Sequence, residues 1–155
     1  MNHKLQRYDS RSFVINIDSC YDGVLAGRFY HTYQGESGQF QDLMQFLLKA
    51  DQIMDETDNP QSFHVIRTFF PSYLPDRDTA ETGFSWAGEI ATFSLHIMFR
   101  RNASWQGNII WMETGLSQNF RSVLELISLI NSVVVSKKMS LYFAPSETEE
   151  MVMAE

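Results

Sequence analysis

Residues 93–113 read FSLHIMFRRNASWQGNIIWME. Phe93, Leu95 and Ile97 alternate with Ser94 and His96. A period of two predicts a strand with one buried face. A short turn, RRNASWQG, then leads into a second apolar run, NIIWME, at residues 108–113. Because so short a connection joins neighbouring antiparallel strands, the stretch predicts a β-hairpin.

The same pattern occurs eighty residues earlier. Residues 13–54 align with residues 93–134 without a gap, with a strand at FVINI, a turn at SCYDGVLAG and a second strand at RFYHTY. Six pairs are identical: Phe13 and Phe93, Ile17 and Ile97, Gly27 and Gly107, Gly35 and Gly115, Ser37 and Ser117, Phe40 and Phe120. We therefore expect an internal duplication.

Each predicted hairpin is followed by a helix. Gly35 and Gly115 break the strands, and Ser37 and Ser117 are suitable N-cap residues ahead of an apolar stripe. Spacings of three, four and seven place the stripe on one helix face. The expected stripes are Phe40, Leu43, Met44, Leu47, Ala50, Ile53 and Met54 in the first copy, and Phe120, Val123, Leu124, Ile127, Ile130, Val133 and Val134 in the second.

Further elements are expected between and after these units. Residues 62–70, SFHVIRTFF, have the composition of a strand, and residues 71–83 that of a loop. Residues 84–99 predict one long strand, or two strands broken at Gly88, and residues 139–144 predict a short last strand. Each copy would then be ββαβ.

These elements predict a single α+β domain over residues 1–145, with copies at about 13–70 and 84–145 joined by the 71–83 loop. We expect a two-layer sandwich in which a mainly antiparallel sheet of about six strands carries two helices on one face. Residues 146–155 form an acidic tail that we expect to be disordered. The other sheet face would be solvated, covered by the 71–83 loop or, as we favour, used for dimerisation. That face would carry Asn16, Asp18, Arg28, Tyr30, Ser94, His96, Met98, Ile110 and Met112.

Composition restricts the class of protein. With 155 residues, 44% of them hydrophobic, the chain is long enough to bury a core without disulfides, and it has a single cysteine, Cys20. The net charge of −7 disfavours general nucleic-acid binding. No apolar run reaches membrane-spanning length, and because MNHKLQRYDSRS at residues 1–12 is polar we expect no signal sequence. We expect a cytoplasmic protein, from a bacterium.

Catalytic patterns are weak. The four histidines have no metal-binding spacing, and no phosphate-binding glycine loop is present. Cys20 and His31 could be imagined as a nucleophile and its base, but no third group is evident. Asp18 and Asp22 could be paired carboxylates, but such pairs need burial and aspartates in turns are usually solvated. We expect no enzyme activity, no cofactor and no metal.

The turn at 100–107 is the best candidate for a binding site. It gathers Arg100, Arg101, Asn102, Ser104 and Trp105, which are residue types that bind anions or anchor interfaces. The alternative is a structural turn. Asn102 and Ser104 would then supply turn hydrogen bonds, Gly107 would relieve a bulge, and both arginines would lie in solvent.

Asn102, Ser104 and Gly107 form N-x-S-x-x-G, which resembles the short signature of PilZ domains. The resemblance implies binding of cyclic di-GMP, with arginines holding the phosphates. Two departures oppose it. Arg100 and Arg101 are adjacent, whereas the family's arginine pair is spaced R-x-x-x-R, and only one strand, rather than several, is expected after the signature.

A broader resemblance covers residues 93–134. FRRNASWQGNIIWME followed by NFRSVLELISLINS is similar to short conserved proteins of Gram-positive anaerobic bacteria. That family implies no assigned activity, so no functional residue is carried over. The sequence thus predicts a non-catalytic binding or regulatory module, acting as a homodimer or with a protein partner. The alternative is a sensor of an anionic, nucleotide-like ligand that uses the 100–107 turn.

Overall fold

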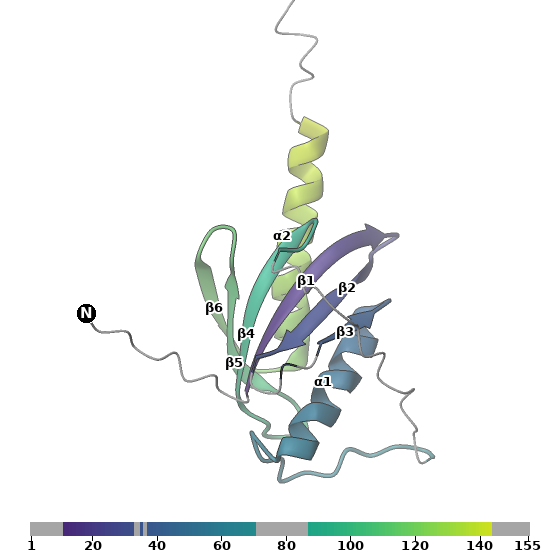
Figure 1. Ribbon diagram of the computed structural model, residues 1–155, viewed down its shortest axis with the longest axis vertical. Helices are drawn as coiled ribbons and strands as arrows, with labels where there is room; N and C mark the ends of the chain where they lie inside the picture. The colour runs from purple at the N-terminus through teal and green to yellow at the C-terminus, as the bar shows by residue number, and fades with distance from the viewer. Residues whose placement is uncertain (1–10, 33–34, 36, 71–86, 144–155) are drawn as a thin grey trace, which may run out of the picture.

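The protein is a six-stranded antiparallel sheet with two helices, an α+β fold as the sequence predicts. The computed structural model describes residues 11–32, 35, 37–70 and 87–143 (Figure 1). The sheet order is β3-β2-β1-β4-β5-β6. The strands are β1 (Ser12–Tyr21), β2 (Val24–His31), β3 (Ser37–Phe40), β4 (Ala91–Phe99), β5 (Gln106–Trp111) and β6 (Leu116–Phe120). The helices are α1 (Leu43–Thr57) and α2 (Val123–Phe143).

Each half of the chain is βββα, and not the ββαβ that the sequence predicts. The third strand of each half comes before the helix, at β3 and β6. The predicted last strand at 139–144 is wrong, because α2 continues to Phe143 and extends beyond the sheet in Figure 1. The predicted strand at 62–70 is also wrong: only Ser62 forms an isolated bridge, with Arg100. The predicted 71–83 loop and 146–155 tail lie outside the described residues.

The two hairpins have corresponding registers. Gly27 pairs with Ile17 and Gly107 with Ile97, and a bulge follows each isoleucine. A Cβ atom at Gly27 would overlap the carbonyl oxygen of Asn16, and one at Gly107 that of His96. Both glycines are therefore required by close backbone approach. The correspondence at a spacing of eighty agrees with a duplication, which stays a prediction.

The core lies between the sheet and both helices. Phe46 of α1 packs on the rings of Phe13 and Phe29, and Leu126 occupies the corresponding buried position in α2. The sequence analysis assigned neither residue to the apolar stripes. It placed Met44 and Leu124 there instead, and both are exposed. Ala50, Ile53, Met54, Ile130 and Val134 of the predicted stripes are buried, so the buried face of each helix overlaps the predicted one.

The predicted N-caps at Ser37 and Ser117 are wrong, since both residues lie in strands. Asp42 caps α1, where its Oδ1 accepts a hydrogen bond of 2.8 Å from the backbone N–H of Gln45. At the start of α2, the Oγ of Ser122 accepts one from Glu125. These side chains satisfy N–H groups that have no partner within the helix.

We expect Asp42→Ala to lower the free energy of unfolding by about 1 kcal/mol, because the Gln45 N–H loses its acceptor. Urea unfolding followed by circular dichroism measures the change. Asp42→Ser is the control and should retain most of the stability, because serine also caps helices. Equal losses in both variants would contradict the assignment of the cap.

The sheet face opposite the helices is partly covered by residues 87–90. Arg28 donates two hydrogen bonds to the Asp18 carboxylate, and a third to the carbonyl oxygen of Ala87. The hydrogen bonds that Arg28 donates to the Asp18 carboxylate raise the pKa of Arg28. Below this segment Asn16 is fully buried, whereas Met98 and Met112 are exposed. Strand β4 begins at Ala91, so residues 87–90 interrupt the predicted strand near Gly88, and residues 84–86 lie outside the described residues.

Candidate functional site

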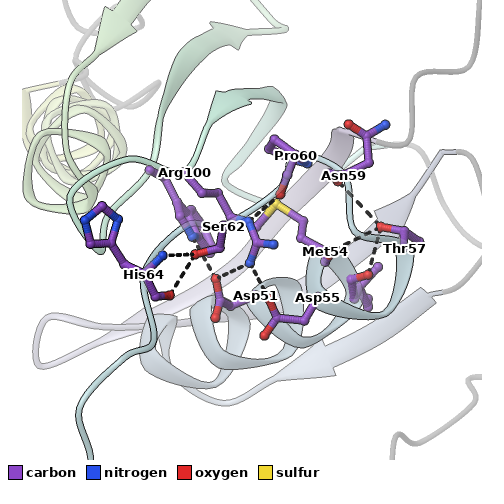
Figure 2. A network of polar contacts seen from close by, with 11 residues as sticks. Asp51, Met54, Asp55, Thr57, Asn59, Pro60, Ser62, His64 and Arg100 are labelled. Carbon is purple, nitrogen blue, oxygen red and sulfur yellow. Dashed lines mark hydrogen bonds and ion pairs between the residues drawn. The ribbon is translucent and has the colours of Figure 1, made fainter.

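Arg100 is a structural residue and not a free anion-binding group. Its side chain is only 4% exposed. Its Nε donates to the carbonyl oxygen of Pro60 at 2.7 Å, and its Nη1 donates to Asp51 at 3.2 Å and Asp55 at 2.6 Å. Figure 2 shows the guanidinium between these two carboxylates of α1. The guanidinium thus joins the end of β4 to α1 and to the chain that follows it.

A β-bulge accounts for the position of Arg100. The β4–β5 register shifts between Ile97 and Phe99. A bulge interrupts the simple alternation of side chains along a strand. Both Met98 and Phe99 are consequently exposed, and Arg100 turns to the helix side. The expectation that Arg100 lies in solvent is wrong.

Trp105 and Ser104 also hold the fold together. The Nε1 of Trp105, a buried residue, donates to Asp51 Oδ1 at 3.1 Å, and its ring meets Phe46 edge-on. The Oγ of Ser104 accepts a hydrogen bond from the Val123 N–H at the start of α2. Both residues therefore position the helices.

Arg101 and Asn102 are the exposed members of the predicted set. The guanidinium carbon of Arg101 lies 4.3 Å from the centre of the Phe99 ring. Asn102 and Ala103 have positive φ angles of 55° and 53°, as is typical of a tight turn. The five predicted site residues therefore do not converge on one pocket. Three of them face the protein interior or a helix terminus, and two face solvent.

The remaining elements of a phosphate site are not assembled in the described residues. An R-x-x-x-R spacing occurs once in the sequence, at Arg7 and Arg11, a match that the sequence analysis missed. The Nε of Arg11 donates to Asn59 Oδ1 at 2.9 Å, and Arg7 lies outside the described residues. The PilZ resemblance gains no support from these contacts.

The catalytic pairs considered from the sequence are separated or occupied. Cys20 pairs with Leu25 and His31 with Phe13, so the two lie towards opposite ends of the β1–β2 hairpin. Asp18 is held by Arg28, and Asp22 is an exposed turn residue. Within residues 11–32, 35, 37–70 and 87–143, no group of three or more His, Cys, Asp or Glu side chains could hold a metal ion.

A groove lies between α1 and the chain that follows it. It has a volume of about 620 Å³ and is lined by residues from the two sides, among them Leu48, Gln52, Val65 and Ile66. Figure 2 shows the polar contacts among residues that line the groove, including Asp51, Asp55 and Arg100. The His64 ring points away from both aspartates. The Oγ of Ser62 binds the backbone of His64.

The chain beside this groove is apolar and exposed. We define the apolar segment as residues 62–70. Its five large hydrophobic side chains are between 54% and 102% exposed. Among the described residues, the backbone of 65–70 has no hydrogen-bond partner. The members are Phe63, Val65, Ile66, Phe69 and Phe70. Exposed apolar patches of this kind mark interaction surfaces.

A second groove, of about 330 Å³, lies between α2 and the β5–β6 edge of the sheet. Its lining is mainly apolar and includes Trp111, Leu116, Leu129 and Val133. Lys137 stands over it, with its Nζ 6.0 Å from the centre of the Trp111 ring. We call this the β6 groove.

Glu125 is the described carboxylate with the largest pKa displacement. Hydrogen bonds from the guanidinium and backbone N–H of Arg121 lower its pKa from 4.5 to about 2. Because the pKa of Glu125 is lower in the folded state, its ionised form stabilises the fold at pH values above the pKa of the unfolded chain. This stabilisation is lost as the pH falls from about 4.5 towards 2. Both side chains are at the surface, so the effect on stability is small.

We expect Arg121→Gln to raise the pKa of Glu125 towards its ordinary value, because the guanidinium is lost and only the backbone N–H remains. An NMR titration of the Glu125 side-chain carbonyl from pH 6 to pH 2 would measure it. An unchanged midpoint would show that the ion pair is absent in solution.

No helix in the described residues is both long and apolar enough to cross a membrane. No family model, curated protein or solved structure matches this chain. The resemblance to proteins of Gram-positive anaerobes stays a prediction.

Proposed function

We propose that this protein is a non-catalytic binding module whose contact surface for another protein is the apolar segment, residues 62–70. The observation that carries the proposal is the exposure of five large hydrophobic side chains in nine consecutive residues. Leaving them in water costs the free energy that burial would return, about 25 cal/mol per Å² of apolar surface. A protein partner would remove that cost.

The composition of the segment supports a protein partner over other ligands. Phenylalanine, valine and isoleucine offer contact area and few hydrogen-bonding groups, so they suit a broad apolar interface better than a small polar ligand. Aromatic residues are also enriched in interfaces. The segment carries no acidic residue, although the whole chain has a net charge of −7.

The alternative of a ligand sensor at the 100–107 turn loses its main residue. Arg100 already binds two carboxylates and a carbonyl oxygen. A phosphate would have to displace Asp51 and Asp55 to reach the guanidinium. Because Arg100 is occupied, only Arg101 remains, and the two arginines cannot hold a phosphate together.

Site-specific photo-crosslinking in the cells that make the protein tests this proposal. A photo-reactive amino acid at Ile66 should give a protein adduct. The same group at Tyr21, which is 82% exposed at the β1–β2 turn, is the control and should give none. Adducts from position 102 and none from position 66 would move the contact surface to the turn and contradict the proposal.

A further inference from the structure

The two edges of the sheet are protected differently. At β3, the Nζ of Lys49 donates to the carbonyl oxygen of Gln39 at 2.7 Å. Eighty positions later, β6 has Asn119 and α2 has Leu129, which cannot donate a hydrogen bond. In the described part of the chain, no side chain donates to the carbonyl of Asn119. Edge strands usually carry a device against pairing with other chains. Strand β3 is protected by the hydrogen bond from Lys49, and β6 lacks a corresponding lysine.

The side chains of β6 do not close this edge. Its first four residues, Leu116, Ser117, Gln118 and Asn119, are exposed, and none is charged or a proline. Leu116 is 65% exposed and lines the β6 groove together with Leu129 and Val133. Among the described residues, the edge therefore offers unpaired backbone next to an apolar depression, which is the arrangement that binds an added strand.

The apolar segment has the matching pattern. In a strand, alternate residues face the same side. Phe63, Val65, Arg67 and Phe69 would then face the β6 groove. The opposite side would carry Ile66 and Phe70 together with three polar residues, Ser62, His64 and Thr68. The three polar residues would extend the polar sheet face on which Ser117 and Asn119 bind the Asn108 side chain.

One copy of the chain does not join the two features. Figure 1 shows that the apolar segment passes the end of α1 on the side of the sheet away from β6. Strand β6 is the terminal strand at the opposite edge from β3, with which α1 is in contact. A second copy supplies both halves, a strand-like segment and an edge strand, each of them unpaired among the described residues.

The area is sufficient for a stable dimer. The two phenylalanines on the groove side, Phe63 and Phe69, bury about 150–250 Å² each and give roughly 400 Å² per segment, before Val65 is counted. With two reciprocal contacts and both surfaces counted, the total reaches about 1,600 Å², the size of a standard interface.

We propose that two copies exchange their apolar segments, so that residues 62–70 of each add a strand to the β6 edge of the other. The proposal rests on the function proposed above and names the partner as a second copy of this chain. Each dimer then has two equivalent contacts, and each contact has a donor, the segment, and an acceptor, the β6 edge.

Sedimentation velocity of the purified full chain tests the exchange, with variants at each half. The wild type should be a dimer at micromolar concentration. Phe63→Ser combined with Phe69→Ser, and separately Leu116→Lys, should each weaken dimerisation at least about a hundredfold, since buried aromatic anchors carry most interface energy. Tyr21→Ser and Leu124→Lys are the matched controls. They change exposed apolar residues outside both halves and should leave the dimer intact.

Mixing the two defective variants gives the sharper result. The donor-defective chain has an intact β6 edge, and the acceptor-defective chain has an intact segment. An equimolar mixture should therefore form heterodimers through one intact contact, where neither variant forms dimers alone. A mixture that stays monomeric, or a wild type that is monomeric or forms an open-ended series, would overturn the exchange.

The two proposals fail in different ways. A monomeric wild type with an adduct at position 66 leaves the binding module standing, with a different protein as partner. A monomer without any adduct at position 66 removes both. A dimer that survives the Phe63→Ser and Phe69→Ser changes overturns the exchange and moves the dimer contact elsewhere.

Discussion

Replacing Phe46 by alanine should lower the free energy of unfolding by about 3–5 kcal/mol. The ring is fully buried and packs against the rings of Phe13, Phe29 and Trp105, which come from three strands or their connections. Removing it leaves a cavity between α1 and the middle of the sheet. Because Phe13 and Phe29 are held by strand pairing, they cannot collapse fully into the space. Guanidinium unfolding followed by tryptophan fluorescence measures the loss.

Met44→Ala is the control for Phe46→Ala. It removes a large apolar side chain from the same helix two residues earlier, where the side chain is exposed. We expect a change within about 0.5 kcal/mol. Similar losses in both variants would mean that α1 is rotated in solution relative to the structure.

Arg100→Ala should also destabilise the protein, by about 3 kcal/mol. Removing one partner of a buried ion pair typically costs about 3–5 kcal/mol, because it leaves an uncompensated charge. The lower end applies here, because Asp55 is largely exposed and regains water, and Asp51 keeps its hydrogen bond from Trp105. Thermal and urea unfolding would both show the loss.

Arg101→Ala provides the matched comparison with Arg100→Ala. The two residues are adjacent and chemically identical, but Arg101 lies at the surface over the Phe99 ring. We expect its removal to change stability by less than about 0.5 kcal/mol. If Arg101→Ala were the more damaging variant, the assignment of Arg100 as the structural arginine would be wrong.

The sequence predicted the sheet better than the helices. Alternation at Phe13, Ile15 and Ile17, and at Phe93, Leu95 and Ile97, is confirmed by their complete or near-complete burial. The short third strands were missed because SGQF and LSQNF are only four and five residues long and carry little apolar alternation. Missing them placed each helix start too early. Phe46 and Leu126 were left out of the core because Met44 and Leu124 also fit the apolar spacing.

The candidate site was less predictable, because tertiary contacts decide it. The strand-like composition of 62–70 is real, but the backbone that would pair with it is not supplied by the described part of the chain. Composition indicates a tendency to form a strand, and only the fold determines whether a partner strand is available. Likewise, the role of Arg100 depends on a bulge and on two aspartates about fifty residues earlier, which local pattern does not reveal.

Hydrogen–deuterium exchange of the full chain at low and high protein concentration tests the central claim most directly, because it reports on the apolar segment and on β6 together. If two copies swap their apolar segments, amides in 62–70 and in 116–120 should become protected from deuterium as the protein concentration rises. The turns at 21–24 and 100–105 should not change. Rapid deuterium uptake in 62–70 at every concentration, or new protection confined to the 100–105 turn, would contradict pairing of the apolar segment with β6.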